Sequence, residues 1–560
     1  MYIPLHVHSC YSVLRGTSGI DVLVSKAKQY KLPYLALTDT NGMYGLIQFA
    51  AKLKEEGIKP VLGVCIDEPG KPDLYALIIP INRTGYAEMC SMITARKLRD
   101  DFSLFRALAE PLPNLAIITP SMELLEKIGR GEMVFAELIT TPARKPYTRR
   151  LYHFARERGI PLVASNPVYF AEAGDYLLHK VVAAIRERST LANIDPKHLE
   201  DEGFYFRDPA ELEQEWKGLP EALANTRRIA EAVDLDLRIG EFKFPTFPVD
   251  PPETSYSLLW KLAFDGLRQR YGVLTDAAVS RLNYEIGVIK DLNFVDYFLV
   301  VWDILREARR RGMMTLGRGS AGNSLVSYCL GFTDVDPIKY DLYFERFLNK
   351  SRTTPPDVDI DFSWRERDEI IKYVFDKYGY DRVAMISTTV TFRARSAFRE
   401  TAKVFGISEA ELSEYSKLIP WTDARNLPDI AARFPEARSL KFDTEPWKTI
   451  VNLAARLAGF PRHLSIHPSG IVIAPEPITR FCALEFAKNK GLGLIVTQPD
   501  MYPVEELGLV KIDLLSQRAL GVLRDTVDKV KLPDEACSAP QGVVLPLIQN
   551  TQFQLSGKSV

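Results

Sequence analysis

Residues 355–362 read P-P-D-V-D-I-D-F, and this stretch decides how the remainder of the chain is interpreted. Side chains on a β-strand alternate between the two faces of a sheet, so Asp357, Asp359 and Asp361 share one face while apolar residues occupy the other. Carboxylates lined up in this way repel one another, and Mg²⁺ relieves the repulsion because it binds oxygen ligands and keeps positions open for substrate phosphates. The stretch therefore predicts a strand with a metal site. On its own it is equally compatible with a half-buried strand whose acidic face is solvated.

A glycine-rich turn lies upstream, where residues 315–324 read T-L-G-R-G-S-A-G-N-S. Its glycines, Gly319 among them, let the backbone approach a ligand closely. Arg318 and Ser320 add hydrogen-bond donors suited to phosphate. The apolar run at residues 325–330 predicts a helix whose N-terminus faces the bound anion.

A third stretch, residues 341–349, reads D-L-Y-F-E-R-F-L-N and has Arg346 as its only cation. This arginine is either a phosphate ligand or the partner of Glu345 or Asp341. The order of the three stretches, G-R-G-S, then F-E-R-F-L-N, then P-D-V-D-I-D-F, resembles the catalytic core of the bacterial replicative DNA polymerase III alpha subunit, the C family.

The resemblance extends over nearly all of the 560 residues. Further matching stretches are Y-E-I-G-V-I and Y-F-L-V-V-W-D before the glycine turn, G-F-T-D-V-D-P after it, H-L-S-I-H-P-S-G-I-V-I-A-P from His463, and V-T-Q-P-D-M from Val496. The start of the chain resembles the PHP domain of the same family.

An α/β multi-domain fold is what the resemblance implies: a PHP-type distorted α/β barrel, then a nucleotidyltransferase-like mixed-sheet palm with a helical thumb. The first 64 residues agree, since helical patterns at 20–32 and 45–56 alternate with strand patterns at 34–38 and 60–64. The predicted domains are the PHP domain at 1–241, a proline-rich linker at 242–255, the palm at 256–390 and 469–518, the thumb at 391–468, and the start of the fingers at 519–560.

Composition is that of an ordinary soluble protein, with 46% hydrophobic residues, 26% charged residues and a formal net charge of −1. No apolar run is long enough to cross a bilayer, and the first residues do not form a signal peptide. The six cysteines include no C-x-x-C pair, so neither a zinc knuckle nor a disulfide framework is indicated. We therefore expect a cytoplasmic protein without a membrane partner.

The metal cluster of the PHP domain is expected to be incomplete. His6 and His8 match the family's H-x-H ligands, and His179 persists on a predicted helix, where a lone histidine is more often structural. The other family ligands are replaced, so we expect a scaffold without phosphoesterase or proofreading activity, although a single Zn²⁺ on His6 and His8 stays open. The replacing residues are Arg15, Thr40, Cys65, Pro167 and Tyr169.

The resemblance also assigns the polymerase site. Asp357, Asp359 and Asp513 are the expected catalytic residues and the ligands of two Mg²⁺ ions. Asp361 is assigned to structure or to outer-shell support. Residues 508–515 read G-L-V-K-I-D-L-L and predict a strand with Lys511 and Asp513 on one face. The expected ligands of the nucleotide triphosphate are Arg318, Gly319, Ser320, Arg346 and Lys511.

A basic segment follows the aspartate stretch, with Arg393, Arg395 and Arg399 at near-helical spacing and aromatic residues between them. It is either a contact surface for DNA phosphates or a solvated helix face. The partners implied are primer–template DNA, deoxynucleoside triphosphates, and either a separate C-terminal polymerase half or other replisome subunits.

Family members continue for hundreds of residues beyond the point where this sequence stops, and its last residues faintly resemble the start of the fingers. We therefore expect a DNA-directed DNA polymerase core that is a fragment, a truncated paralogue or half of a split enzyme. The alternative is a non-catalytic scaffold or DNA-binding interaction protein. A PHP phosphoesterase is disfavoured by the replaced ligands.

Overall fold

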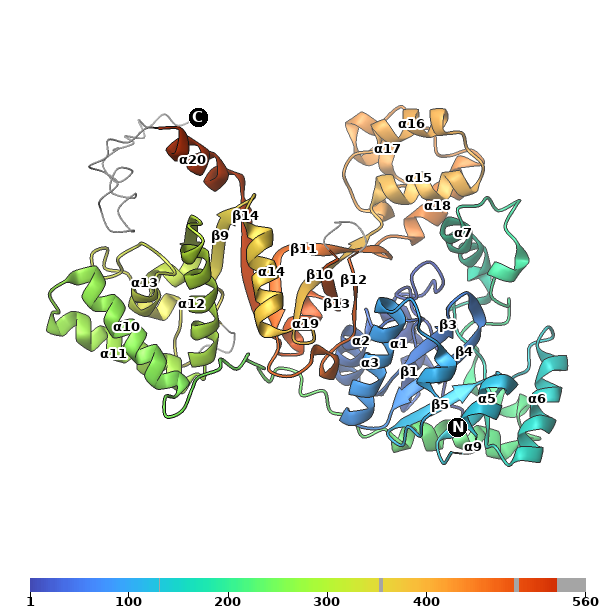
Figure 1. Cartoon of the computed structure of the whole chain (residues 1–560). Coiled ribbons are helices and arrows are strands. Elements are labelled where there is room, and N and C mark those ends of the chain that lie inside the picture. The colour runs from blue at the N-terminus through green and yellow to red at the C-terminus, as the bar shows by residue number, and fades with distance from the viewer. Residues whose placement is uncertain (130, 352–355, 488–492, 531–560) are drawn as a thin grey trace.

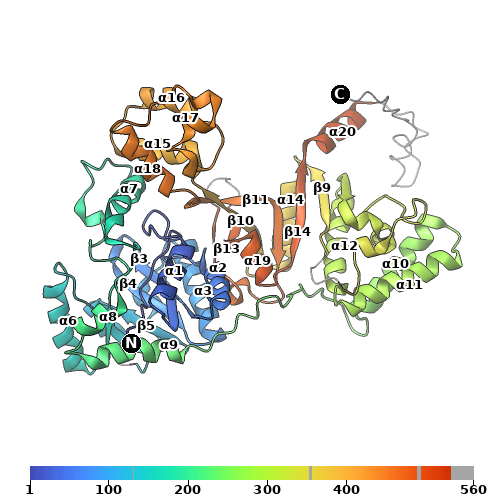
Figure 2. The ribbon, with the colours of Figure 1, turned by 180° about the vertical axis from the view of Figure 1, so that it is seen from behind.

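A computed structural model of the chain describes residues 1–129, 131–351, 356–487 and 493–530 (Figure 1). Pro355, Cys537 and the whole expected tail at 531–560 lie outside the described residues. Two sheet-containing parts and two helical groups make up the molecule. Both views show helices α10–α13 next to the edge of the larger sheet that carries β9, and the group α15–α18 beside α7 of the N-terminal part (Figures 1 and 2).

The N-terminal part is an α/β unit whose strands form a distorted barrel. Five strands are hydrogen-bonded in the order β3-β4-β5-β6-β7, and β1 pairs in parallel with β2. Parallel bridges from Val7 to Val168 and from Thr40 to Cys65 connect the ends of these sheets. The expected distorted α/β arrangement is confirmed. The strands are β1 Tyr34–Leu37, β2 Lys59–Leu62, β3 Val64–Glu68, β4 Lys71–Pro80, β5 Leu115–Thr119, β6 Val134–Ile139 and β7 Leu162–Ser165.

Helices cover this barrel because each buries one apolar stripe. In α1, Ile20, Leu23 and Ala27 recur at helical spacing and are buried. Its predicted end at residue 32 is wrong, since the helix stops at Gln29 and Lys31 takes a positive φ of 52°. The helices are α1 Ile20–Gln29, α2 Leu46–Glu55, α3 Arg83–Leu98, α4 Leu104–Ala107, α5 Met122–Ile128, α6 Lys145–Arg158, α7 Tyr176–Glu187, α8 Pro209–Glu215 and α9 Pro220–Ala232.

The second part is built on a mixed seven-stranded sheet with the order β12-β13-β10-β11-β14-β9-β8. The pairs β9–β14 and β10–β13 are parallel and the others are antiparallel. Strands far apart in sequence therefore lie side by side at its centre. The strands are β8 Thr315–Arg318, β9 Asp359–Ser363, β10 Val383–Thr391, β11 Pro461–Ile473, β12 Leu484–Phe486, β13 Ile495–Asp500 and β14 Lys511–Gln517.

Helices flank this sheet, and one group is inserted between β10 and β11. The flanking helices are α10 Ser255–Tyr271, α11 Asp276–Asp291, α12 Val295–Arg310, α13 Leu325–Leu330, α14 Arg367–Tyr378, α19 Met501–Glu506 and α20 Arg518–Lys529. The inserted helices are α15 Ala394–Val404, α16 Glu409–Leu418, α17 Ile430–Arg433 and α18 Trp447–Arg456. Helix α14 starts only at Arg367, because Ser363 still belongs to β9.

One hydrophobic core spans both parts of the molecule. Met89 and Cys90 of α3 belong to the same cluster of buried residues as Ile386 of β10 and Val472 of β11. Helix α3 packs against β12 and against the 3₁₀ turn η7 at Ile478–Arg480. The N-terminal unit is therefore docked on the larger sheet through apolar contacts. Among the described residues no helix is long and apolar enough to span a membrane.

Candidate active site

Four neighbouring strands align the residues of the aspartate site in one row across the sheet. Asp513 on β14 is the direct partner of Asp359 on β9. On the outer sides, Gly470 of β11 pairs with Asp513, and Arg318 of β8 pairs with Asp359. Asp357, Asp359 and Asp513 each offer one carboxylate oxygen within 4.8 Å of the others. The structure thus brings together the three aspartates that were predicted as catalytic.

The three carboxylates differ in exposure and repel one another electrostatically. Asp357 is exposed, Asp359 is half-buried and Asp513 is buried. Burial, followed by the charges of Asp357 and Asp513, raises the pKa of Asp359, although Arg318 and Lys511 offset part of this. Three converging carboxylate oxygens suit a hard divalent cation, whose charge would remove this repulsion.

Asp513 is held through both of its oxygens. Lys511 Nζ donates to Oδ2 at 2.6 Å, and Ser469 Oγ donates to Oδ1 at 2.6 Å. Lys511 Nζ also lies 3.9 Å from Asp357 Oδ1. Burial works against the charged form of Lys511, but the hydrogen bond and the charge of Asp513 outweigh it and raise the pKa of the ammonium group. The lysine is therefore a fixed cation at the rim of the aspartate group.

His467 holds the backbone directly after Ser469. The backbone N–H of Gly470 donates to His467 Nδ1 at 2.8 Å, so this ring nitrogen is unprotonated. Burial lowers the pKa of His467, which keeps the ring neutral at physiological pH. Neither side chain was predicted to be functional from the H-P-S-G sequence. The only signal was its place in a stretch shared with the family.

The glycine turn lies against the aspartate strand. Gly319 has a φ of +74°, and a Cβ there would lie 3.6 Å from Asp359 Oδ2. Arg318 Nε lies 3.6 Å from Asp361 Oδ1 and 3.9 Å from Asp359 Oδ2, so its guanidinium neutralises these carboxylates. Ser320 is half-buried in the 3₁₀ turn η3 at Gly319–Asn323.

The expected anion site at the N-terminus of α13 is wrong, because a carboxylate of the chain occupies that position. Glu285 Oε2 accepts hydrogen bonds from Val326 N at 3.1 Å and from Ser324 Oγ at 2.8 Å. Ser324 also caps the helix by accepting from Ser327 N. Glu285 is fully buried and was not predicted from the sequence to be functional. The helical pattern around Glu285 gave no indication that its side chain caps another helix.

Arg346 lies in the 3₁₀ turn η4 at Phe344–Arg346, which packs beside η3. Its side chain is exposed and forms no ion pair or hydrogen bond with any residue that the structure describes. The alternative ion pair between Arg346 and Glu345 is not formed. Glu345 Oε1 instead accepts a hydrogen bond from Tyr284 OH at 2.9 Å. The arginine therefore presents a solvent-facing cation.

The three basic residues expected to contact DNA lie at the start of α15. Arg395 donates to the Ile419 carbonyl at 2.7 Å, and Arg399 donates to Ser416 Oγ at 3.0 Å. These two side chains therefore connect α15 to the C-terminal end of α16 and to the residue that follows it. Arg393 is exposed and lies over the ring of Trp421, at 5.7 Å from its centroid. Trp421 is 86% exposed, so this pair presents a cation and an aromatic ring to solvent.

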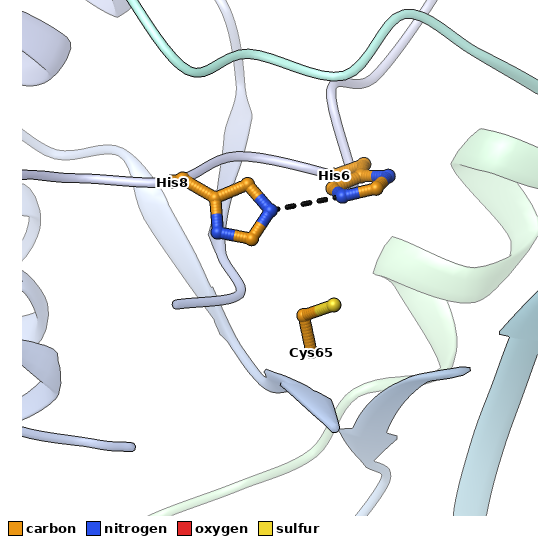
Figure 3. A group of neighbouring side chains, drawn as sticks. All are labelled: His6, His8 and Cys65. Carbon is orange, nitrogen blue, oxygen red and sulfur yellow. Dashed lines mark hydrogen bonds between the residues drawn. The ribbon is translucent and has the colours of Figure 1, made fainter. Parts of the chain in front are cut away.

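A second group of metal-ligating residues lies in the N-terminal unit. His6, His8 and Cys65 each offer a ligand atom within 4.8 Å of the others. Figure 3 shows the three side chains as neighbours. Arg15 lies at the same site, 3.9 Å from Asp67 and 3.9 Å from Glu200. A guanidinium in this position and the missing carboxylate ligands do not fit the multi-ion cluster that the resemblance implies.

Comparison with known proteins agrees with this architecture. Residues 257–516 match the family described as the bacterial DNA polymerase III alpha NTPase domain, and residues 4–127 match the PHP domain. The chain therefore contains a PHP domain followed by a bacterial DNA polymerase III alpha NTPase domain. The polymerase III alpha resemblance drawn from the sequence is thereby confirmed.

Relatives of this chain include an error-prone DNA polymerase from Symbiobacterium thermophilum, 35% identical over 94% of this chain and 52% of the relative. The DNA polymerase III subunit alpha of Bacillus subtilis is 32% identical over 95% of this chain and 49% of its own length. That of Escherichia coli is 32% identical over 94% and 49%. The chain spans about half the length of the curated relatives it matches.

Proposed function

We propose that the chain is the catalytic core of a DNA-directed DNA polymerase that transfers nucleotides to a primer 3′-hydroxyl by a two-metal mechanism. The observation that carries this proposal is the pairing of Asp513 with Asp359 on adjacent parallel strands, which gathers three carboxylate oxygens within 4.8 Å. Two Mg²⁺ ions bound there would supply the charge that stabilises the attacking and leaving oxygens. The family relationship supports the same chemistry.

In this proposal the residues of the chain position and neutralise the substrates. Asp357, Asp359 and Asp513 would hold the ions, and Ser469 keeps Asp513 in place through its hydrogen bond to Oδ1. Lys511 lies at the rim of the aspartate group and meets the negative charge of the triphosphate. The larger sheet then acts as the palm and the inserted helices as the thumb.

Arg346 and the turn at Gly319 and Ser320 complete the proposed triphosphate site. Arg346 is exposed beside the turn, and its fork of donors suits phosphate oxygens. Arg318 is assigned a different part, because it already neutralises Asp359 and Asp361. For DNA, Arg393 with Trp421 offers a cation and an aromatic face, whereas Arg395 and Arg399 are hydrogen-bonded to the Ile419 carbonyl and to Ser416.

Primer extension tests the proposal. The chain is mixed with the C-terminal half of a relative, and extension is measured with the wild-type chain and with Asp359→Ala and Asp513→Ala. Extension should fall on the order of 10²–10³-fold in either variant, since each removes a group that stabilises the transition state. Binding of primed DNA should weaken steeply with salt, because phosphate contacts release counterions.

The alternative, a non-catalytic scaffold, predicts a different set of results. It gains support if no extension occurs with any C-terminal half and the chain shows no salt-sensitive DNA binding. Extension that survives Asp359→Ala and Asp513→Ala would contradict the assignment of the aspartates. The matched control is Asp368→Asn, which changes an exposed carboxylate on α14 away from the aspartate row.

A further inference from the structure

Tyr297 on α12 carries a buried hydroxyl group whose proton has no acceptor. Its side chain is 0% exposed, and no residue that the structure describes accepts a hydrogen bond from its OH. A buried polar group left in this state lowers folding stability, and such exceptions to good local packing are expected at functional sites. The surroundings of this hydroxyl connect it with the aspartate group.

Tyr297 approaches the aspartate group from the hydrophobic core. Helix α12 lies next to β9 in both views (Figures 1 and 2). Tyr297 shares one cluster of buried residues with Val358, whose neighbours in the sequence are Asp357 and Asp359. Because Val358 is fully buried in this core, the carboxylates on either side of it project away from the core. The tyrosine therefore lies beneath the segment that carries two of the three aspartates.

The charges of the aspartate group act on this hydroxyl. Burial raises the pKa of Tyr297, and the charge of Asp357 is the next largest cause. Asp513 and Asp359 raise it further, whereas the backbone N–H of Val358 lowers it. The phenol therefore keeps its proton at neutral pH. An N–H group is only a donor, so Val358 gives this proton no acceptor.

Asp357 is the member of the aspartate group that lacks a hydrogen bond to hold it. Asp513 accepts from Ser469 and from Lys511, each at 2.6 Å. Lys511 Nζ lies 3.9 Å from Asp357 Oδ1, which is too long for a hydrogen bond. Among the described residues no other side chain forms an ion pair with Asp357, and its own side chain is exposed. A carboxylate without a donor thus lies beside a donor without an acceptor.

We propose that Tyr297 is a positioning residue of the metal site, whose hydroxyl donates to the Asp357 carboxylate and orients it toward the ions. The bond would form when Asp357 turns inward as a ligand, in the same way that Ser469 already holds Asp513. Metal-ligating carboxylates are commonly oriented by such outer-shell donors. This inference rests on the proposed function, because it takes Asp357 as a metal ligand.

Removal of the hydroxyl separates this role from a structural one. Tyr297→Phe keeps the ring and deletes only the oxygen. A hydroxyl that supports the core would lower the denaturation midpoint when removed, but an unsatisfied one should leave the midpoint without Mg²⁺ unchanged or higher. The loss should appear only with metal. We expect the Mg²⁺ affinity of the variant to fall by about 10–100-fold.

Calorimetry and denaturant unfolding of the full chain, each with and without Mg²⁺, test the proposal. Titration of Asp359→Ala identifies the heat that belongs to the aspartate group. The matched control is Tyr378→Phe on α14, whose hydroxyl donates to Asp303 Oδ2 at 3.0 Å. This control should lower the midpoint without Mg²⁺ and leave the Mg²⁺ affinity unchanged, which is the reverse of the pattern expected for Tyr297→Phe.

Three results would overturn the inference. The first is equal Mg²⁺ affinity in Tyr297→Phe and the wild type. The second is a drop in the midpoint without Mg²⁺ as large as that of Tyr378→Phe. The third is a wild-type chain without Asp359-dependent Mg²⁺ binding. Failure of primer extension in a chain that shows the expected Mg²⁺ pattern would count against the polymerase proposal alone, so the two failures are recognised separately.

Discussion

At the scale of single residues, Ser469 shows how the chain positions Asp513, the aspartate that we propose to be catalytic. Its hydroxyl is buried and donates to Asp513 Oδ1 at 2.6 Å, while Lys511 holds the other oxygen. We predict that Ser469→Ala lowers Mg²⁺-dependent primer extension by about 10–100-fold, the usual cost of losing a group that orients a metal ligand. The measurement is extension against Mg²⁺ concentration, where the variant should need more metal.

The control for Ser469 is Ser465→Ala, an exposed serine on the same strand. It should leave extension and its metal dependence unchanged. If Ser469→Ala extends primers as the wild type does at every Mg²⁺ concentration, Asp513 is positioned without its help.

Asp359 provides a prediction in which a substitution stabilises the protein. Its pKa is raised by burial and by the charges of Asp357 and Asp513. Between the unfolded and the folded pKa the native state binds more protons than the unfolded state, so stability falls as pH rises through that window. Asp359→Asn removes this penalty. The free energy of unfolding at neutral pH without Mg²⁺ should therefore rise, because the neutral amide does not repel Asp357 and Asp513.

Denaturant unfolding at several pH values checks this. The gain should shrink as the pH falls toward the ordinary range of an aspartate, and added Mg²⁺ should stabilise the wild type more than the variant. Asp368→Asn, at an exposed position, should show neither trend. A loss of stability in Asp359→Asn at neutral pH would mean that the attraction to Arg318 outweighs the repulsion.

At the scale of elements, the glycine turn depends on close backbone approach. A Cβ on Gly317 would lie 1.7 Å from the carbonyl oxygen of Phe332, which is backbone and cannot move aside alone. Gly317→Ala should displace β8 from β9 and destabilise the chain by about 1–3 kcal/mol. Arg318 would then lose its register opposite Asp359, and Mg²⁺ binding should weaken in calorimetry.

The matched control is Gly322→Ala in the same turn, where the nearest atom to an added Cβ is Thr333 Oγ1 at 3.9 Å. It should be tolerated in both measurements. Equal effects of the two alanines would show that the turn is sensitive to any added side chain rather than to its contact with Phe332.

Much of the element pattern could be predicted from local sequence, but the pairing could not. Residues 325–330 form α13 as expected, since an apolar run follows a turn with a serine cap. The faces of β9 and β14 follow from the alternation of apolar residues and carboxylates. Register is different, because Asp513 meets Asp359 through contacts between strands more than 150 residues apart, which no local pattern encodes. The same applies to Glu285, whose capping of α13 is a long-range contact.

Only part of the N-terminal group of His6, His8 and Cys65 could be predicted from the sequence, because some of its contacts join residues far apart in the chain. The H-x-H spacing places His6 and His8 together on one segment, and the replaced ligands could be read from the sequence. Glu137 could not be anticipated, because it reaches His6 from β6 across 131 positions. Ser12 likewise gains its meaning only from its contacts with Asp39 and His8.

At the scale of the whole molecule, the proline-rich segment at 242–255 does not separate two independent parts. A polar network joins them in addition to the shared core: Tyr44 OH donates to Glu485 at 2.5 Å, and Gln498 donates to Glu485 at 3.2 Å. Gln498 is fully buried and also accepts from Met43 N at 3.0 Å. The N-terminal unit is therefore expected to unfold together with the larger sheet.

We predict that Gln498→Ala lowers the free energy of unfolding of both parts together by about 1–3 kcal/mol, because it leaves a buried N–H of Met43 without its partner. Single-tryptophan chains report each part: Trp216 lies in the N-terminal unit and Trp302 on α12. Both probes should give one coincident transition that shifts to lower denaturant in the variant. Gln48→Ala, at an exposed position on α2, should shift neither. Two separate transitions, with only Trp216 responding to Gln498→Ala, would show that the interface docks two independently stable parts.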